Sequence, residues 1–90
     1  MLDELYQTIL ARKSARPEGS YTASLFEKGE DEILKKVGEE SVEVILAAKA
    51  QGNARLTEEV ADLTYHVLVL LASRGLSPAD IAAELEKRKR

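Results

Sequence analysis

Apolar residues recur every three or four positions along most of this sequence, the spacing that places them on one face of a helix. Strict alternation, which would indicate strands, never lasts. The first apolar stripe ends before Arg16-Pro17-Glu18-Gly19-Ser20, where proline and glycine predict a loop. A first helix is therefore expected before that loop, and its apolar face consists of Leu2, Leu5, Tyr6, Ile9 and Leu10.

The segment after the loop predicts a short second helix from near Tyr21 to about Lys28. Ser24 and Glu27 would form a capping box if this helix starts slightly later. Gly29 weakens the helical pattern, so the chain is expected to kink or pause there.

Two long helices are predicted next, from about Asp31 to Ala50 and from Ala54 or Thr57 to Ser73. Gln51-Gly52-Asn53 lies between them and is a turn signal, in which the glycine suits a helix C-cap. Because the turn is short, the fourth helix should fold back antiparallel to the third.

Arg74-Gly75 ends the fourth helix with a basic residue and a C-cap glycine. Ser77-Pro78 then provides the N-cap and first position of a last helix that contains Ile81, Ala82 and Leu85. The sequence therefore predicts an all-α fold, a small helical bundle of four to five helices, in a single domain over residues 1–90.

The predicted fourth helix is apolar around nearly its whole circumference, from Val60 to Ala72. A helix of that kind is normally buried on all sides. One chain of 90 residues offers too few neighbouring helices for this, so we expect dimerisation to complete the bundle.

Composition excludes several function classes. The net charge is −3 and the pI is near 5.2, which argues against a nucleic-acid surface. The basic Lys87–Arg90 run suits a solvated helix end that complements the helix dipole. The longest apolar run, Val67–Ala72, is too short to span a membrane, and the acidic N-terminal segment does not fit a signal peptide. Cysteine is absent, which fits a cytoplasmic protein.

Two carboxylate runs, Glu39-Glu40-Ser41-Val42-Glu43 and Glu58-Glu59-Val60-Ala61-Asp62, lie within the long helices. Successive helical residues rotate by about 100°, so residues three apart share a side. If the helices cross symmetrically about the turn, Glu43 comes opposite Asp62. Four carboxylates then converge, and they need a divalent cation or must lose charge.

Hard oxygen ligands favour Mg²⁺, with Mn²⁺ as a possible substitute. Lys36 shares the carboxylate face and suits phosphate oxygens. The same residues also have a plainer interpretation, because Glu39, Glu58 and Lys35 fit a solvated helix face. His66 lies on the acidic stripe of the fourth helix, although a lone histidine is more often a core or interface residue than a ligand. A di-iron site is excluded because Asp62, not histidine, follows Glu59 at the third position.

The spacing Glu39-Glu40-x-x-Glu43 followed by Glu59-x-x-Asp62 resembles the signature of the MazG-like all-α nucleoside triphosphate pyrophosphohydrolases. Three segments make the resemblance narrower, to the phosphoribosyl-ATP pyrophosphohydrolase family. These segments are Pro17–Thr22, Ile33–Glu40 and Glu59–His66, and the resemblance covers about residues 1 to 88. One departure is Ser41, where alanine is expected; its hydroxyl could bond the carbonyl one turn back.

The resemblance implies a cytoplasmic, generally dimeric enzyme of histidine biosynthesis. Its reaction is Mg²⁺-dependent hydrolysis of phosphoribosyl-ATP to phosphoribosyl-AMP and pyrophosphate, the second step of that pathway. By motif, the metal ligands would be Glu40, Glu43, Glu59 and Asp62.

Catalytic and substrate-binding roles are less closely defined. Glu39, or a ligand carboxylate such as Glu40, is expected to accept the proton of the attacking water. Tyr21 and Thr22 either reach the nucleotide or cap the second helix. The candidates for contact with the substrate are Tyr21, Thr22, Lys28, Lys35, Lys36 and His66, with Lys36 best placed for phosphate.

Two other functions remain open at the level of sequence. One is a house-cleaning nucleoside triphosphate pyrophosphohydrolase, which shares the metal signature. The other is a non-catalytic dimeric helical adaptor with an acidic groove. A substrate panel would separate the first from the expected enzyme, and Mg²⁺-induced stabilisation would argue against the second.

Overall fold

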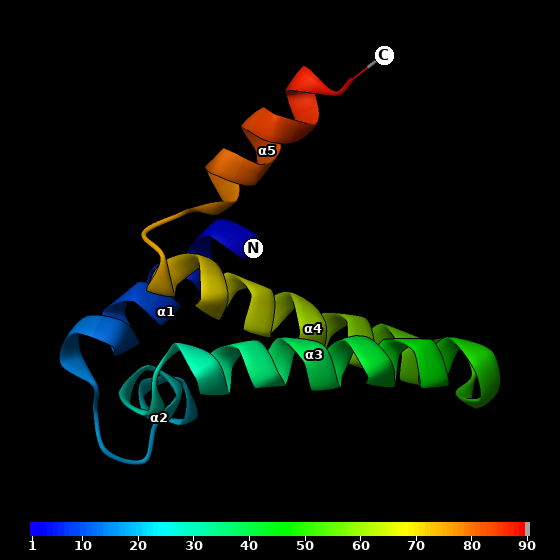
Figure 1. Ribbon diagram of the computed structural model, residues 1–90, viewed down its shortest axis with the longest axis horizontal. Helices are drawn as coiled ribbons and strands as arrows, with labels where there is room; N and C mark the ends of the chain where they lie inside the picture. Colours follow the sequence, from blue (N-terminus) through cyan, green and yellow to red (C-terminus); the bar gives the residue numbers. More distant parts are fainter. Residues whose placement is uncertain (90) are drawn as a thin grey trace.

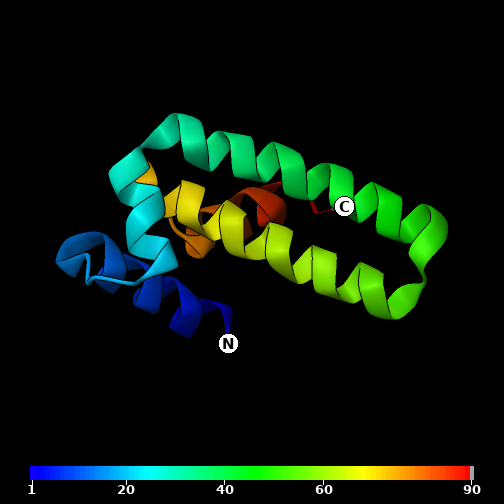
Figure 2. The same ribbon diagram turned by 90° about the horizontal axis from the view of Figure 1, so that it is seen from below.

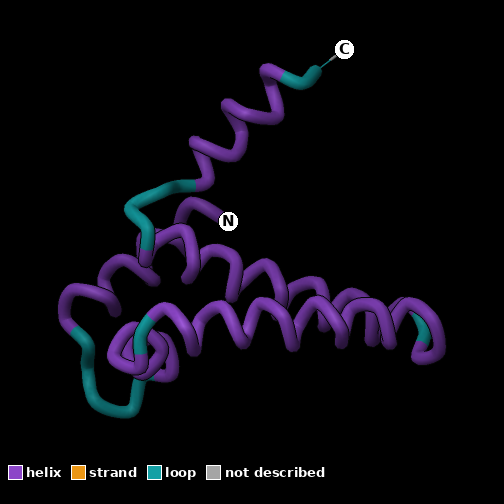
Figure 3. Tube along the Cα trace, in the orientation of Figure 1, coloured by secondary structure: helices purple, strands orange, loops and turns teal. Residues whose placement is uncertain are grey.

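The computed structural model describes residues 1–89, and within them the chain forms helices and no strands (Figures 1 and 3). The predicted all-α class is confirmed. The elements are α1 (Leu2–Ala15), α2 (Tyr21–Lys28), α3 (Glu30–Leu46), the π-helical turn η1 (Ala47–Gln51), α4 (Asn53–Ser73) and α5 (Pro78–Lys87).

Local capping interactions set the end of α1 and the start of α2. Helix α1 stops at Arg16, whose left-handed backbone (φ 49°, ψ 56°) lets its N–H donate to the Arg12 carbonyl, and Pro17 follows. Helix α2 is capped by Ser20, whose hydroxyl accepts a bond from the Ala23 N–H at 3.1 Å. The later start with a Ser24 capping box is therefore wrong.

Helices α3 and α4 form an antiparallel hairpin that dominates the molecule (Figure 2). Gly52 makes the predicted turn with φ 88° and ψ 170°, a conformation that is essentially restricted to glycine. The predicted third helix does reach this turn. However, its last stretch, Ala47–Gln51, is wound as a π-helix, which the apolar pattern did not indicate.

The hydrophobic core lies at one end of the hairpin, where α1 and α2 pack against the start of α3 and the end of α4 (Figure 1). Ile9, Leu25, Ile33 and Val69 are the largest fully buried side chains there. The other half of the hairpin lacks such cover, and its exposed apolar residues are Val42, Ile45, Leu46 and Val60. In this one chain, α4 is therefore not buried on all sides.

Helix α5 projects away from the hairpin (Figure 1). Ser77 and Asp80 form a capping box at its start and Pro78 takes the first position, which confirms the predicted start. The Tyr6 hydroxyl donates to the Leu76 carbonyl and fixes the preceding linker to α1. None of the residues Pro78–Lys87 is buried.

Two further expectations concern the surface. Lys87 and Arg88 both pair with Glu84 on α5, as expected of a solvated helix end, and Arg90 lies outside the described residues. Within residues 1–89, no helix is both long and apolar enough to cross a membrane.

Candidate active site

An acidic cavity of about 490 Å³ opens between the middle of α3 and the first half of α4. Its lining combines both predicted carboxylate runs with one basic side chain. The residues that line it are Glu39, Glu40, Glu43, Arg55, Glu59 and Asp62.

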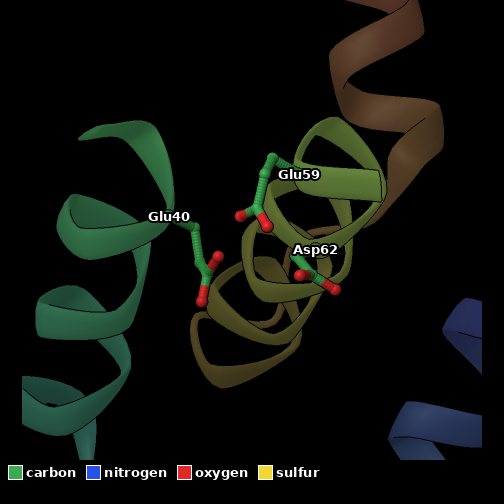
Figure 4. Close-up of side chains that lie close together, drawn as sticks. All are labelled: Glu40, Glu59 and Asp62. Carbon is green, nitrogen blue, oxygen red and sulfur yellow. The ribbon is translucent and has the colours of Figure 1, made fainter. Parts of the chain in front are cut away.

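Three of these carboxylates form a close group. Each of Glu40, Glu59 and Asp62 has an oxygen within 4.8 Å of an oxygen of the other two. Figure 4 shows Glu40 reaching from α3 toward Glu59 and Asp62 on α4. Oxygens that share one Mg²⁺ ion lie at most about 4.2 Å apart, so small side-chain adjustments would let this group hold one ion.

Glu43 lines the cavity but is not part of the close group, in which Glu40 is the residue that α3 contributes. Glu40 lies twelve residues before Gly52, whereas Asp62 lies ten residues after it. The π-helical turn lies on the α3 side of Gly52 and would contribute to this asymmetry. Its bonds span five residues instead of four, so more residues fit into the same length on the α3 side.

Glu59 is a buried carboxylate of the cavity, with only 3% of its surface exposed. Burial raises the pKa of Glu59, and the nearby charges of Asp62, Glu40 and Glu43 raise it further. The Arg55 guanidinium opposes this rise through a 2.6 Å contact between Nη2 and Oε1 of Glu59. A divalent cation would relieve the same repulsion, so the donor set fits a hard metal ion.

Arg55 is a cavity residue that sequence reasoning missed. Its Nη1 donates to Oε1 of Glu58 at 3.1 Å, while Nη2 contacts Glu59. Among the described residues that line the cavity, it is the only cationic one. The available signal was its position, three and four residues before these two glutamates on one helix.

Beside the cavity, three aromatic rings from α2 and α4 form a cluster. The Nδ1–H of His66 donates to the Asp62 carbonyl at 2.8 Å, which leaves Nε2 to accept from the Tyr21 hydroxyl at 2.8 Å. The Tyr65 ring stacks on Tyr21, and its hydroxyl is bonded to the buried Thr22. His66 is buried, whereas Tyr21 is 49% exposed.

Tyr21 is influenced by the charges around the acidic cavity, although it is not one of the described residues that line it. Partial burial raises the pKa of Tyr21, with Lys36 opposing and Glu40, Glu32 and Asp62 adding to the rise. The hydroxyl therefore lies within the electrostatic range of both the carboxylates and a lysine.

The three predicted lysines are not equivalent. Lys36 is half-buried, and its Nζ lies 3.5 Å from Oε1 of Glu39. The pKa of Lys36 is raised by Tyr21 and by Glu39. Lys28 and Lys35 are exposed, and none of the three lysines is among the described residues that line the cavity. The structure thus pairs Lys36 with Glu39, which lines the cavity, and shows no such pairing for Lys28 or Lys35 among the described residues.

Ser41 forms the hydrogen bond to the α3 backbone that its position predicted. Its hydroxyl donates to the Val37 carbonyl one turn back, at 2.8 Å. It therefore satisfies the backbone of α3.

Known proteins resemble this chain along nearly its whole length. Residues 2–89 match the model of the family described as phosphoribosyl-ATP pyrophosphohydrolase. The phosphoribosyl-ATP pyrophosphatase of Pelotomaculum thermopropionicum is 57% identical over 89 residues, which cover 99% of this chain and 91% of the relative. The Listeria welshimeri protein of the same name is 58% identical over 99% of this chain and 85% of its own length. That of Saccharolobus solfataricus is 52% identical over 100% and 96%. The chain therefore belongs to the phosphoribosyl-ATP pyrophosphohydrolase family.

Proposed function

We propose that this chain hydrolyses phosphoribosyl-ATP to phosphoribosyl-AMP and pyrophosphate in a Mg²⁺-dependent reaction, the second step of histidine biosynthesis in the cytoplasm. One observation carries the proposal: in a member of this family, α3 and α4 bring three carboxylates within 4.8 Å of one another. The broader house-cleaning activity and the adaptor function have no comparable support from the relatives, which are named phosphoribosyl-ATP pyrophosphatases.

Glu40, Glu59 and Asp62 would hold the Mg²⁺ ion, and Glu43 is available as a fourth ligand from the cavity wall. When bound, the ion supplies Lewis-acid polarisation of phosphoryl oxygens and of a water molecule. Mn²⁺ has similar preferences and should substitute.

Glu39 is the better candidate for the general base. It lines the cavity and lies outside the close group of three carboxylates, so its charge is not committed to the cation. Lys36 holds one of its oxygens at 3.5 Å, which restricts the position of the carboxylate. A carboxylate positioned in this way can take the proton of a water that attacks between the α- and β-phosphates.

Tyr21 and Lys36 would bind the substrate at one end of the cavity. The half-exposed Tyr21 ring offers a surface for a base or ribose, and the Lys36 ammonium suits a phosphate. His66 and Thr22 would act mainly by holding Tyr21 and Tyr65. Lys28 and Lys35 remain candidates for contact with the outer, ribose-phosphate end of the substrate.

We further propose that a second copy of this chain covers the apolar groove between α1, α4 and α5. This groove has a volume of about 390 Å³, and Leu63, Val67, Ile81 and Leu85 are among its lining residues. An isolated helix as short as α5 is marginal in water, so its amphipathic face needs a partner. Two copies related by a two-fold axis would present the same face to each other.

The function is tested by measuring pyrophosphate release from phosphoribosyl-ATP, with ATP as a parallel substrate, in Mg²⁺ and then in excess chelator. Conversion of phosphoribosyl-ATP alone, lost in chelator, is the expected result. Cleavage of ATP at a similar rate would instead indicate a house-cleaning enzyme. No cleavage of either substrate would contradict an enzymatic function.

A further inference from the structure

Arg55 poses an electrostatic problem for the site described above. Its guanidinium lies 2.6 Å from Glu59, one of the three carboxylates proposed to hold a divalent cation. Two positive groups would then share one carboxylate. Like charges at such distances repel strongly where solvent is partly excluded, so a bound Mg²⁺ ion would weaken the Arg55–Glu59 contact.

Once a cation neutralises the buried Glu59, the Arg55 side chain can leave it at little cost. It is 47% exposed, and its second contact is with Glu58, which is 66% exposed. Ion pairs in such surroundings contribute little to stability. Arg55 lies one helical turn before Glu59 on α4 and has a long, flexible side chain, so the exchange would require a change of its rotamer and no backbone movement.

The cavity also needs a positive group that faces the substrate. Apart from Arg55, the described residues that line it are all carboxylates. The guanidinium already faces this cavity, because Arg55 is one of its lining residues and contacts the buried Glu59. A planar guanidinium binds two phosphate oxygens at once, a geometry that an ammonium group lacks.

We propose that Arg55 exchanges partners during the reaction: it neutralises Glu59 in the free protein and binds phosphate oxygens of the triphosphate once a divalent cation occupies the carboxylates. This rests on the proposed function, because it requires a metal-bound triphosphate in the cavity. Glu59 is then neutralised in both states, by Arg55 in the first and by the cation in the second. The substrate arrives at a cavity in which a phosphate-binding group has just been released.

The proposal is tested with Arg55→Gln and Arg55→Lys, and with Glu58→Gln as a matched control that removes only the exposed contact. Calorimetry measures the binding of Mg²⁺ alone, and then of inorganic pyrophosphate at saturating Mg²⁺. Arg55→Gln should bind Mg²⁺ as tightly as the wild type or more tightly, because a competing cation is gone. Its affinity for pyrophosphate should fall, and its KM for phosphoribosyl-ATP should rise, by about 10- to 100-fold.

Arg55→Lys should recover part of the pyrophosphate affinity, and Glu58→Gln should change neither binding constant. Weaker Mg²⁺ binding by Arg55→Gln would overturn the proposal, because it would make Arg55 a fixed support for Glu59. Unchanged pyrophosphate affinity would overturn it as well. Melting in chelator verifies that each variant is folded. If the wild type itself neither binds Mg²⁺ nor turns over phosphoribosyl-ATP, the proposed function fails too. If the wild type does both and Arg55→Gln shows either contrary result, only the partner exchange fails.

Discussion

Glu59 shows how the environment of a single residue can favour ligand binding over stability. Its carboxylate is buried, and its neighbours include the carboxylates of Glu40, Glu43 and Asp62. Such a group costs free energy in the unliganded protein, because burial and like charges both oppose ionisation. A cation that binds only the folded protein offsets this cost, by about 2.7 kcal/mol at a concentration of roughly 100 Kd.

Glu40→Gln should therefore separate stability from activity. It removes one carboxylate from the close group, so Mg²⁺-dependent turnover should fall by at least about a hundredfold. In chelator, the melting temperature should stay equal or rise, because one repulsive charge is lost. Pyrophosphate release and thermal melting with and without Mg²⁺ measure both effects. Full activity with normal Mg²⁺ stabilisation would rule out Glu40 as a ligand.

Thr22→Val tests whether a predicted substrate residue acts through packing. The Thr22 hydroxyl is buried and bonded to Tyr65, so its loss should destabilise the fold by about 1 kcal/mol and leave KM nearly unchanged. Thr57→Val is the matched control. It removes an exposed hydroxyl bonded to the Asn53 carbonyl, and it should change stability by no more than about 0.5 kcal/mol. Denaturant unfolding and steady-state kinetics provide the two readouts. A raised KM without loss of stability would place Thr22 in contact with the substrate.

The sequence pointed to all the described residues that line the acidic cavity except Arg55, but it could not say how they meet. Spacing along one helix is a local property, so the pairing of Glu59 with Asp62 on one face of α4 was predictable. Which α3 residues meet them depends on the register between helices, and of the two expected ligands, Glu40 and Glu43, Glu40 lies in the close group. Arg55 was overlooked because a cation beside two glutamates on a helix suggests an ordinary surface pair.

At the scale of elements, the turn at Gly52 determines how the hairpin is closed. Its φ of 88° with ψ near 170° is accessible to glycine and costly for any other residue, although the position has open space around it. The site depends on this turn, because the register between α3 and α4 decides which carboxylates meet.

Gly52→Ala should destabilise the protein by about 1–3 kcal/mol through backbone strain alone. The register between α3 and α4 should also loosen, and Mg²⁺ affinity should fall with it. Gly38→Ala is the opposite control. Gly38 lies within α3 with open space around it, so alanine there should stabilise the helix by up to about 1 kcal/mol. Chemical unfolding and Mg²⁺ titration of both variants provide the comparison. Equal effects of the two substitutions would contradict a special role for the turn.

The helices themselves were predictable to within a few residues, because caps and breakers are local signals. Pro17, Gly29 and Ser77-Pro78 each mark a boundary that the structure retains. The π-helical turn Ala47–Gln51 was not predictable from the apolar pattern, since its residues are ordinary helix formers. Ala47 is buried at its start, so contacts within the hairpin, which the local pattern does not encode, accompany this turn.

At the scale of the whole molecule, the core and the site occupy different parts of the hairpin. The buried core joins α1 and α2 to one end, the acidic cavity lies along the middle, and α5 extends outward (Figure 1). Apolar side chains on α5 and on the outer half of α3 remain exposed, among them Leu85, Val42 and Ile45. This distribution is the physical basis for expecting a second copy.

Leu85→Glu is expected to break that assembly. Leu85 is 63% exposed in the single chain and lines the apolar groove, so a charge there would have to be buried at the proposed interface without a partner. Ala83→Glu introduces the same charge two residues earlier on α5, at an exposed position outside the set of described residues that line the groove. Light scattering after size exclusion should report a dimer for the wild type and for Ala83→Glu, and a monomer or unfolded protein for Leu85→Glu.

A wild-type monomer that melts cooperatively would show that α5 is stable without a partner, and the exposed apolar face would then need another explanation. If instead the dimer persists in Leu85→Glu, the interface lies elsewhere, and the uncovered apolar half of the α3–α4 hairpin becomes the surface to test next.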